Sequence, residues 1–406
     1  MHRPTHVIVG ASLAGASAAA SLRKEGFDGR IVLIGDEAEA PYERPELSKK
    51  YLRAEPDTDM LVHEPGFYAD AGIELLTGAR VEAIDVANRT VSVGSEPIAF
   101  DRLLLAIGSE PRRPAISGAD LPNVLTLRTK HDSDSVRERA LEAERIVVIG
   151  GGWIGSEVAA SLRQLGGDVA LVTPARTPLE RILGPEVGDL YRAAHEQAGV
   201  RLVAGTTATA FEGKDRVTGV RTADGRTIPA DLVVVGIGAT PRTGLASAAG
   251  IAVDDGVLTD QHLETSAAGI FAAGDVANAW HPVYGRRIRV EHWDNAKRQG
   301  RAAAPNMLGR ATAYARIPYF YSDQYDLGME YTGFAPRWDR VVFRGDPKAG
   351  PFVAFWLSGD RVAAGMNVNV WDVQPAIEQL VRSGATVDVA ELTDAARPLT
   401  ELSQAA

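Results

Sequence analysis

The sequence contains no cysteine. This absence excludes disulfide bonds, a catalytic thiolate, and a zinc or iron–sulfur centre that the chain ligates with its own cysteines. Histidine is also scarce, and the eight histidines show no metal-ligand spacing such as H-E-x-x-H. We therefore expect no resident metal and no cysteine-based redox chemistry.

Long apolar runs are absent too, since none approaches the ~18 residues that a membrane-spanning helix needs. The N-terminal stretch MHRPTHVIVG leads straight into an apolar strand pattern and leaves no room for a signal peptide, so we expect a cytoplasmic protein. The formal net charge of −10 argues against nucleic acid as a partner. The length of 406 residues suggests two or three domains with ample core.

The most informative segment is Ile146–Glu157, IVVIGGGWIGSE. Its apolar residues predict a strand, its glycines a tight turn, and the residues from Ser156 onward an α-helix. In this G-x-G-x-x-G pattern Gly150 permits the turn, Gly152 lets a pyrophosphate approach the backbone, and Gly155 lets helix and strand pack closely. A phosphate would then meet the helix N-terminus. The segment predicts a dinucleotide site, with a simple glycine-rich turn as the alternative.

A second copy of this pattern lies near the N-terminus. The strand Val7–Val9 leads into Gly10-Ala11-Ser12-Leu13-Ala14-Gly15, and an alanine-rich helix is expected over 16–23. Ser12 replaces the second glycine and is small enough for a phosphate to approach, although the match is weaker. The segments 104–112 and 232–242 also share a pattern of apolar strand, glycine, proline and arginine. We infer a duplication of whole domains and two bound nucleotides, a flavin and a nicotinamide.

The residue after the second strand of each copy bears on ribose binding. Asp36 follows the strand 30–34 and is placed to accept from a ribose hydroxyl, with Glu37 as the neighbouring candidate. The alternative for Asp36 is a solvated loop acid. The equivalent strand, 168–172, is followed by Thr173 instead of an acid. Arg176 would suit the 2′-phosphate of NADPH, or it is an ordinary surface arginine.

Other segments are candidates on weaker grounds. Ser48 is typical of a helix cap, and Lys49 beside it is either a surface charge or a functional group. Asp275 follows a strand of small residues and is either an N-cap or a ligand of a bound group. His292 and Trp293 open a helix, where they serve packing or lie against a flavin.

The remaining pattern predicts further regular structure. We expect a β-meander over 73–103, strands over 340–344, 352–357 and 361–370, an amphipathic helix around 375–383, and a frayed tail rich in Ala, Glu and Ser.

Six segments, in this order, resemble one family. They are RPELSKKYL at 44–52, LRT at 127–129, GGGWIGSEVAA at 150–160, AAGDVA at 272–277, EHWDNAKRQG at 291–300 and FYSDQY at 320–325. With them the chain resembles, over nearly its whole length, the FAD-dependent NAD(P)H:ferredoxin reductases of bacterial oxygenase and cytochrome P450 systems, which are putidaredoxin reductase-like and biphenyl dioxygenase reductase-like proteins. The disulfide reductases of the same flavoprotein class are excluded, because they need a redox-active cysteine pair.

The resemblance implies an α/β fold with two Rossmann-like dinucleotide-binding domains, arranged as in glutathione reductase, and a C-terminal α+β domain. The FAD-binding domain would span 1–112 and 243–316, the NAD(P)H-binding domain 113–242, and the C-terminal domain 317–406. The cofactors would be FAD and either NADH or NADPH. The partner would be a [2Fe–2S] ferredoxin, bound transiently, that serves a cytochrome P450 or a Rieske oxygenase. We expect a monomer or a weak homodimer.

The resemblance also assigns residues. Lys49 would lie beside the isoalloxazine with Glu157 as its ion-pair partner, and these two are the candidate catalytic residues. The cofactor-binding candidates are Gly10, Ser12, Leu13, Ala14, Gly15, Asp36, Arg44, Lys49, Val81, Ala106, Gly108, Arg128, Gly150, Gly152, Ile154, Gly155, Thr173, Arg176, Gly238, Gly274, Asp275, Glu291, His292 and Trp293.

The chain departs from the family at three positions. Thr173 replaces the usual acid, which opens NADPH as a donor beside NADH. Tyr321 stands where tryptophan is common, and Arg242 where asparagine is common. The reaction that the resemblance implies is hydride transfer from nicotinamide C4 to flavin N5, followed by single-electron transfers to the ferredoxin. The Lys49 cation would favour the anionic reduced flavin.

The docking surface and the acceptor stay open at this point. Lys297, Arg298 and Arg301 follow the EHW motif on a predicted helix and would suit an acidic ferredoxin, or they form a solvated helix face. A quinone, rubredoxin, monodehydroascorbate or oxygen would be alternative acceptors on much the same fold. A flavin-binding redox sensor is a rival from another class.

Overall fold

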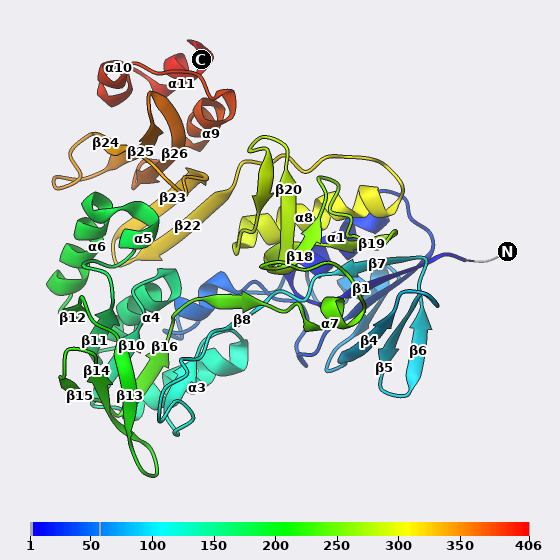
Figure 1. Cartoon of the computed structure of the whole chain (residues 1–406), viewed down its shortest axis with the longest axis horizontal. Helices are drawn as coiled ribbons and strands as arrows, with labels where there is room; N and C mark the ends of the chain where they lie inside the picture. Colours follow the sequence, from blue (N-terminus) through cyan, green and yellow to red (C-terminus); the bar gives the residue numbers. More distant parts are fainter. Residues whose placement is uncertain (1–2, 57, 406) are drawn as a thin grey trace. The chain divides into compact units, whose positions relative to one another are not determined.

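The computed structural model describes residues 3–56 and 58–405. By their internal packing they form two compact units. Unit 1 comprises Met1–Glu43, Asp59–Glu110 and Thr240–Pro318, and unit 2 comprises Arg44–Thr58, Pro111–Ala239 and Tyr319–Ala406. Figure 1 labels the elements of both along the chain. Within the described ranges, no helix combines the length and the apolar character that crossing a membrane requires.

The centre of unit 1 is a parallel sheet in the order β19-β7-β1-β2-β3. Its strands are β1 (Thr5–Val9), β2 (Arg30–Ile34), β3 (Ile73–Leu76), β7 (Arg102–Leu105) and β19 (Ile270–Ala272). One antiparallel sheet is formed by β4 (Val81–Asp85), β5 (Thr90–Val93) and β6 (Glu96–Ala99). In a second sheet, β20 (Ala277–His281) pairs antiparallel with β21 (Arg286–Ile288) and parallel with β18 (Val257–Thr259). The helical segments are α1 (Leu13–Lys24), α2 (Phe67–Asp70), α7 (Gly244–Ala248), the 3-10 turn η2 (Gly274–Val276) and α8 (Trp293–Met307).

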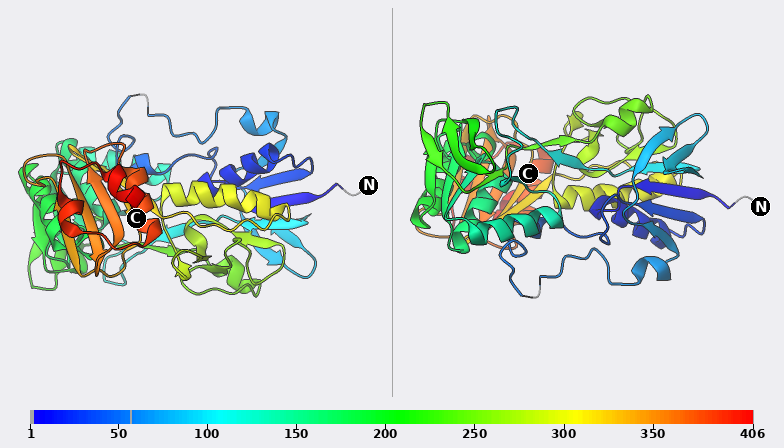
Figure 2. Two further views of the ribbon diagram at one scale, coloured as in Figure 1. Left: turned by 90° about the horizontal axis from the view of Figure 1, so that it is seen from above. Right: turned by 90° about the horizontal axis from the view of Figure 1, so that it is seen from below.

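Both faces of the unit 1 parallel sheet are buried. Along β1, Ile8 belongs to one apolar cluster and Val7 and Val9 belong to another, because alternate side chains of a strand point to opposite faces. A parallel strand covered on both sides needs such a continuous apolar run. One covering layer contains α1 and α8, which pack side by side (Figure 2). Gly300 permits this contact, since a Cβ there would lie 2.2 Å from the Ala14 carbonyl oxygen.

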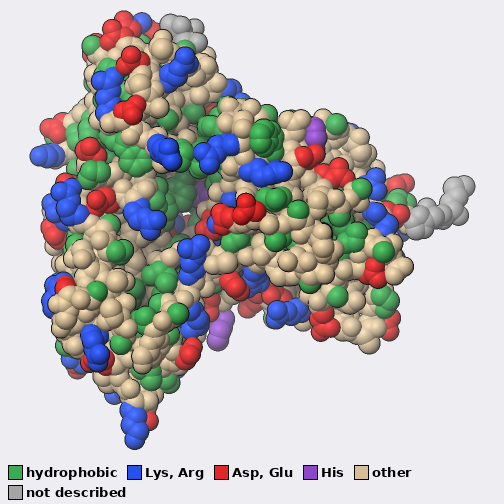
Figure 3. Space-filling model, in the orientation of Figure 1, with side chains coloured by type: hydrophobic (Ala, Val, Ile, Leu, Met, Phe, Trp, Pro, Cys, Tyr) green, Lys and Arg blue, Asp and Glu red, His purple; other side chains and the backbone are tan. Residues whose placement is uncertain are grey.

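The centre of unit 2 is a second parallel sheet, in the order β12-β11-β10-β16-β9. Its strands are β9 (Val124–Thr126), β10 (Arg145–Ile149), β11 (Asp168–Thr173), β12 (Arg201–Ala204) and β16 (Leu232–Val235). An antiparallel sheet follows, of β13 (Ala208–Gly213), β14 (Val217–Thr222) and β15 (Thr227–Pro229). The helical segments are the 3-10 turn η1 (Pro45–Ser48), α3 (Lys130–Glu142), α4 (Trp153–Gln164), α5 (Glu180–Leu183) and α6 (Pro185–Gln197). Figure 3 shows basic side chains at the tip of the β13–β14 hairpin, where Lys214 and Arg216 are exposed.

Unit 2 also contains an antiparallel sheet in the order β22-β23-β26-β25-β24. Its elements are β22 (Tyr319–Gln324), β23 (Leu327–Gly333), β24 (Arg340–Arg344), β25 (Phe352–Ser358), β26 (Arg361–Val368), α9 (Gln374–Ser383), α10 (Val389–Thr393) and α11 (Leu399–Ala405). Trp356 of β25 is fully buried, and its indole Nε1–H donates to the Leu183 carbonyl at 3.0 Å. The rings of Trp153 and Phe320 pack with centroids 4.3 Å apart.

The predicted duplication is confirmed for four strands of each parallel sheet, and the fifth strands, β19 and β9, take the same place in space from different places in the chain. Reading from one edge, β3-β2-β1-β7-β19 in unit 1 corresponds to β12-β11-β10-β16-β9 in unit 2. Along the chain, each set is interrupted by a three-stranded antiparallel sheet: β4–β6 come between β3 and β7, and β13–β15 come between β12 and β16. The short strands β8 (Ser109–Pro111) and β17 (Ala239–Pro241), which come from the repeated Gly-x-x-Pro-Arg segments, pair with each other. The fold class predicted from the sequence is therefore present.

Several local predictions were wrong at their edges. The helices after the glycine turns begin at Leu13 and Trp153, three residues before the positions expected, because the third motif glycine lies inside the first helical turn. Within 73–103 only β4–β6 form an antiparallel meander, whereas β3 and β7 join the parallel sheet. The expected frayed tail instead contains α10 and α11.

The sequence suggests that Ser48 caps a helix, and this prediction was wrong. Ser48 ends the 3-10 turn η1, and its hydroxyl lies 2.5 Å from Glu157 Oε2. Residues 44–58 pack with unit 2, although the expected FAD-binding segment 1–112 includes them. Three contacts hold them there: Ser133 Oγ donates to the Leu47 carbonyl at 2.8 Å, Tyr51 bonds Asp134, and Arg53 bonds Ser161. The domain boundaries otherwise stay predictions.

Candidate nucleotide and redox site

The first glycine turn, between β1 and α1, tolerates no side chain at two positions. Gly10 has φ +112°, and a Cβ there would lie 2.1 Å from the Ala106 carbonyl oxygen. A Cβ on Gly15 would lie 2.0 Å from the Gly10 carbonyl oxygen. Ser12 is the N-cap of α1 but makes no side-chain capping bond. The first backbone N–H groups of the helix therefore remain available to an anion.

The second turn, between β10 and α4, repeats this geometry. Gly150 has φ +106°, and its Cβ would lie 2.3 Å from the Gly236 carbonyl oxygen. A Cβ on Gly155 would lie 1.8 Å from the Gly150 carbonyl oxygen. A Cβ on Gly152, by contrast, would meet no atom within 4 Å. Gly150 and Gly155 thus shape the turn, whereas Gly152 faces open space at the N-terminus of α4, as a pyrophosphate site requires.

Ile154 lies on the first turn of α4 beside this open face. Its side chain is 45% exposed, and Ile237, after β16, is 37% exposed. Both are large aliphatic side chains left in solvent beside a phosphate-type turn. They fit the flat apolar surface of a nucleotide ring.

The residues at the predicted ribose position lie differently in the two copies. In unit 1, Asp36 Oδ2 lies 3.3 Å from Arg242 Nη1, and both side chains are partly exposed. Arg242 is therefore within reach of the carboxylate that would accept from a ribose hydroxyl. In unit 2, Thr173 is 2% exposed and its Oγ1 accepts from the Ala175 N–H at 3.3 Å. It is packed beneath the turn, since a Cβ on Gly151 would lie 2.8 Å from Thr173 Oγ1.

The loop after β11 presents Arg176 to solvent. Its backbone is fixed by Glu180, whose carboxylate accepts from the N–H groups of Arg176 at 2.7 Å and Thr177 at 3.0 Å. A guanidinium on a fixed loop is a suitable partner for a phosphate monoester.

The most unusual feature of unit 2 is a buried ion pair. Lys49 Nζ lies 3.0 Å from Glu157 Oε2, and the side chains are only 6% and 4% exposed. Lys49 follows the turn η1, and Glu157 lies in the second turn of α4. Lys49 also donates to the Pro45 carbonyl at 3.0 Å. The predicted pairing of these residues is present, and its place beside a flavin stays a prediction.

Hydroxyl groups surround the Glu157 carboxylate. Ser48 Oγ donates to Oε2 at 2.5 Å, and Ser322 Oγ donates to Oε1 at 2.6 Å. Ser48 is itself held by Ser161, which donates to its carbonyl at 2.6 Å. A buried charge is tolerated only when it is paired and hydrogen-bonded in this way.

One aromatic and one acidic side chain complete the surroundings of Lys49. Its Nζ lies 5.6 Å from the centroid of the Tyr321 ring, so the two side chains make a cation–π contact. Burial raises the pKa of Asp323 above its usual value, with the Glu157 charge acting in the same direction and Lys49 opposing it.

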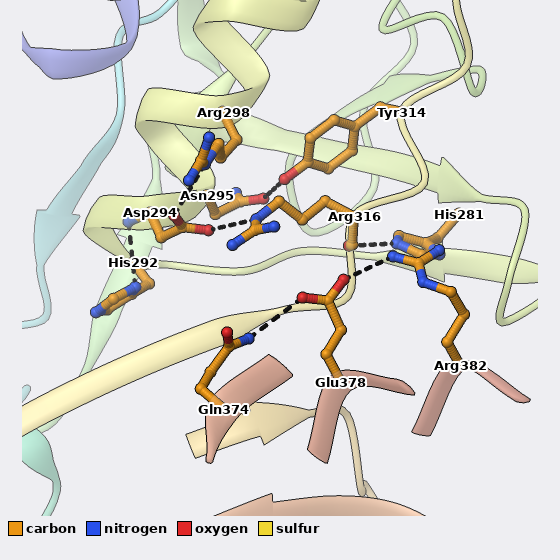
Figure 4. A network of polar contacts seen from close by, with 10 residues as sticks. All are labelled: His281, His292, Asp294, Asn295, Arg298, Tyr314, Arg316, Gln374, Glu378 and Arg382. Carbon is orange, nitrogen blue, oxygen red and sulfur yellow. Dashed lines mark hydrogen bonds and ion pairs between the residues drawn. The ribbon is translucent and has the colours of Figure 1, made fainter. Parts of the chain in front are cut away.

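In unit 1 the predicted residues near the start of α8 form a polar network (Figure 4). His292 is the N-cap of α8, and its Nδ1 accepts from the Asp294 N–H at 3.2 Å. The Asp294 carboxylate is 4% exposed and lies 3.1 Å from the guanidinium groups of both Arg298 and Arg316. Asn295 accepts from the Tyr314 hydroxyl at 3.1 Å. The network fixes the orientation of the helix end that carries His292.

Asp275 lies in η2 and is not its N-cap, since Ala273 occupies that position. The Gly274 N–H donates to Gln299 Oε1 at 2.8 Å, and a Cβ on Gly274 would lie 3.2 Å from the Ala14 Cβ. The AAGDVA segment is thereby packed against the beginning of α1, where the first glycine turn ends.

The other predicted residues are distributed between the units. Unit 1 contains Leu13, Val81, Ala106, Gly108, Glu291 and Trp293, and unit 2 contains Arg44, Arg128 and Gly238. Arg44 Nη1 donates to the Arg128 carbonyl at 2.7 Å, which ties the RPELSKKYL and LRT segments together. Arg289 is paired with Glu291.

The three candidate docking cations differ in their surroundings. Lys297 Nζ lies 4.4 Å from the centroid of the Trp293 ring and 3.7 Å from Glu43. Arg298 is paired with the buried Asp294. Arg301 is exposed. We found no group of acids and histidines suited to a metal among the residues that the structure describes.

Comparison with known proteins decides the family. A family model described as pyridine nucleotide-disulphide oxidoreductase matches residues 4–300. The chain belongs to this family. A second model, described as reductase C-terminal, matches residues 319–403 of this family member. Family membership makes the chain an oxidoreductase and implies FAD and NAD(H) as cofactors.

Individual relatives match this chain over nearly its whole length. Putidaredoxin reductase of Pseudomonas putida is 38% identical over 408 residues, which are 98% of this chain and 97% of that protein. The ferredoxin–NAD(+) reductase component of the biphenyl dioxygenase system of Paraburkholderia xenovorans (strain LB400) is 38% identical over 403 residues, 99% and 98% of the two chains. The crystal structure of the covalent putidaredoxin reductase–putidaredoxin complex matches with a TM-score of 0.94 and 36% identity, covering 99% of this chain and 98% of that one.

Sequence reasoning missed the serines around the family member's buried carboxylate. The sequence around Ser48 suggests a cap, and nothing within FYSDQY assigns a separate role to Ser322. Both hydroxyls bond Glu157. The available signal was that each serine lies in one of the motifs that carry the family resemblance, yet no local pattern connects either to α4.

Proposed function

We propose that the protein is an FAD-containing NAD(P)H:ferredoxin reductase, which passes electrons to a [2Fe–2S] ferredoxin that serves a cytochrome P450 or a Rieske oxygenase. The observation that carries the proposal is the buried Lys49–Glu157 pair in a chain with two glycine turns and no cysteine. The names of the two relatives support the same reaction, since both are reductases of redox-partner systems.

FAD would occupy unit 1 through the first glycine turn. Gly10, Ser12 and Gly15 would hold its pyrophosphate at the N-terminus of α1, where the backbone N–H groups are left without a side-chain cap. Asp36 would accept from the adenosine ribose after exchanging its contact with Arg242. Asp275 would bind the ribityl chain, beside the Gly274 backbone that Gln299 holds.

The nicotinamide nucleotide would occupy unit 2 through the second glycine turn. Its pyrophosphate would lie over Gly152, where the backbone is open, and its ring would contact Ile154. Arg176 would bind the 2′-phosphate of NADPH, because Thr173 is buried and leaves no acid at the end of β11.

Bound FAD supplies the capacity to accept a hydride and to release electrons one at a time. The chain supplies the electrostatics. Lys49 would hold its ammonium toward the negative charge that flavin reduction generates, and Glu157 would keep the ammonium in place. Since Lys49 is almost excluded from water, its charge acts in a medium of low dielectric, where it is stronger than at the surface.

Ferredoxin would bind transiently at a basic surface. Arg301 is the candidate we favour, since Arg298 and Lys297 are already engaged by acids. We further infer that the protein acts in the cytoplasm, where its nicotinamide substrates are kept. Apart from residues 44–58, which pack with unit 2, we infer that the FAD-binding, NAD(P)H-binding and C-terminal domains follow the boundaries expected from the sequence.

The test is an anaerobic titration of the purified protein with NADH and NADPH in parallel, followed by transfer to a ferredoxin. We expect a yellow protein that bleaches with a nicotinamide nucleotide and then reduces the iron–sulfur centre. A colourless protein that binds no added FAD, or a flavoprotein that neither nucleotide bleaches, would contradict the proposal. Rapid electron transfer to a quinone, with no transfer to any ferredoxin, would mean that the acceptor is a quinone.

A further inference from the structure

A chain of hydrogen bonds, buried except at its part-buried Tyr325 end, leads from Glu157 to His195 and Tyr325, which have no role in the proposed site. Ser322 Oγ lies 2.6 Å from Glu157 Oε1, and Gln324 Nε2 lies 3.4 Å from Ser322 Oγ. Gln324 Oε1 lies 3.2 Å from His195 Nε2, and the Tyr325 hydroxyl lies 2.9 Å from His195 Nδ1. All of these residues belong to unit 2.

The carboxylate at one end fixes the direction of every bond in this chain. A carboxylate only accepts, so Ser322 donates its single hydroxyl hydrogen to Glu157 and accepts from Gln324. The Gln324 amide therefore turns its NH₂ group toward Ser322 and its oxygen toward His195. His195 must then carry its hydrogen on Nε2, which leaves Nδ1 to accept from the Tyr325 hydroxyl.

Burial keeps this arrangement fixed. Ser322, Gln324 and His195 are 0%, 1% and 0% exposed. Burial lowers the pKa of His195 from 6.5 to about 4, so the ring is neutral at physiological pH and Nδ1 is free to accept. A buried polar chain in which each member has its partner is rigid, because breaking any bond leaves a polar group unsatisfied away from water.

Tyr325 occupies a backbone position that suits other residue types better. It opens the turn between β22 and β23, in which Gln324 pairs with Leu327, and its φ is +54°. Glycine, asparagine and aspartate adopt this left-handed conformation more readily than an aromatic residue. The bond from its hydroxyl to His195 gives a physical reason for a tyrosine at this turn.

We propose that His195 and Tyr325 are positioning residues of the hydride-transfer site. Through Gln324 and Ser322 they hold the Glu157 carboxylate in the rotation that turns Oε2 toward Lys49. If Gln324 lost its bond to His195, Ser322 would no longer be held as a donor to Oε1. The carboxylate could then rotate, and the ammonium would sample more positions. The inference rests on the proposed function, since Lys49 acts on a flavin only there.

The first test measures the His195 tautomer by ¹⁵N NMR in the full-length protein. We expect hydrogen on Nε2 alone. In Glu157→Gln the new amide can donate to Ser322, so the direction of the chain is no longer fixed and the Nε2–H population falls. The control Tyr191→Phe removes a buried hydroxyl that has no hydrogen-bond partner among the described residues, and it should leave the tautomer unchanged. His6, in unit 1, serves as an internal reference. A tautomer with hydrogen on Nδ1, or one that ignores Glu157→Gln, would overturn the proposal.

The second test measures flavin reduction by stopped flow. His195→Leu should slow it about tenfold at saturating nucleotide with little change in KM, because small misplacement of a charge beside the reacting centre is costly. His195→Gln keeps an N–H toward Gln324 and should recover most of the rate. Tyr325→Phe removes only the hydroxyl group that bonds His195, so it serves as the test if His195→Leu does not fold. It should slow flavin reduction less than His195→Leu does. Rates equal to that of the unaltered protein in a folded His195→Leu or Tyr325→Phe variant would refute the role.

The two tests separate this inference from the proposed function. If the protein binds no flavin, the proposed function fails while the tautomer still reports on the hydrogen-bond chain. If flavin reduction is normal in every His195 and Tyr325 variant, the function stands and the positioning role fails.

Discussion

Lys49 and Glu157 lie 3.0 Å apart in an interior position, although they come from segments far apart in the chain. Lys49 ends a 3-10 turn, and Glu157 lies one turn into a helix that follows a nucleotide-type glycine turn. The pair thus connects the RPELSKKYL segment, whose residues alone indicate no chemistry, to the helix that follows the phosphate-type glycine turn. Its cost in desolvation is offset by two serine hydroxyls and a carbonyl.

Replacing Lys49 by alanine should slow flavin reduction roughly 10- to 100-fold, because one fixed charge beside the developing anion is lost. Stopped-flow absorbance at saturating NAD(P)H measures this rate. The matched control is Lys50→Ala, since Lys50 is the exposed neighbour and should be neutral. A Lys49→Ala protein that is reduced as fast as the Lys50→Ala protein would remove Lys49 from the mechanism.

Two glycines of one motif should fail in different ways. Gly155→Ala places a Cβ 1.8 Å from the Gly150 carbonyl oxygen, so the backbone must move and stability should fall by about 2 to 3 kcal/mol. Gly152→Ala places its Cβ in open space, so stability should change by less than about 0.5 kcal/mol. The same Cβ would occupy the position proposed for the pyrophosphate, so nicotinamide affinity should fall about tenfold or more.

Urea unfolding and nucleotide titration of both variants provide the measurements. If Gly152→Ala binds the nucleotide normally, the pyrophosphate does not lie over this turn. If Gly155→Ala is as stable as the unaltered protein, the close packing of helix and strand is not required.

Arg176→Ala should raise KM for NADPH about tenfold or more and leave KM for NADH nearly unchanged, because a guanidinium–phosphate contact is lost only with the phosphorylated nucleotide. Arg181→Ala, a nearby exposed arginine, is the control. Steady-state kinetics with each nucleotide decides the point. Equal effects on both nucleotides, or none on either, would return Arg176 to the status of a surface residue.

Acid should destabilise the protein through His195. Burial lowers its pKa from 6.5, the ordinary value that the unfolded chain retains, to about 4 in the folded protein. Between these two values the unfolded chain binds more protons, so stability falls as pH drops through this window. At pH 5 the loss relative to neutral pH should be about 2 kcal/mol from this residue. His6 should behave alike, since burial lowers its pKa to about 4 as well.

Urea unfolding at pH 7.5 and pH 5 tests this linkage. His195→Gln cannot take up the proton, so its loss of stability over the same interval should be smaller by about that amount. An unchanged pH dependence in His195→Gln would mean that the ring is protonated in the folded state.

Arg301→Glu should weaken ferredoxin-dependent turnover several-fold at low salt and much less at high salt, because exposed charges are screened over about 10 Å at moderate ionic strength. Flavin reduction by nucleotide should be unaffected, which serves as the control within the same protein. Arg310→Glu is a second control, since Arg310 is exposed and already paired with Glu25. If both variants behave alike, docking does not involve Arg301 specifically.

The sequence by itself determined the parts of this protein that depend on local spacing. The apolar strands, the glycine turns and their duplication follow from residues within about a dozen positions of one another, because a βα turn closes locally. The absence of cysteine excluded disulfide chemistry without any structure. The resemblance of six short segments added the family.

Tertiary structure alone decided which side chains meet. Ser48 follows a proline-rich turn, and its sequence suggests a cap, yet its hydroxyl contacts Glu157 because residues 44–58 pack against α4. Ser322 reaches the same carboxylate from β22, and His195 of α6 is connected to it only through Gln324 and Ser322. Hydrogen bonds between distant segments depend on how sheets and helices pack, and short-range patterns carry no record of that packing. The polarity of the chain from Tyr325 to Glu157 is therefore a property of the fold.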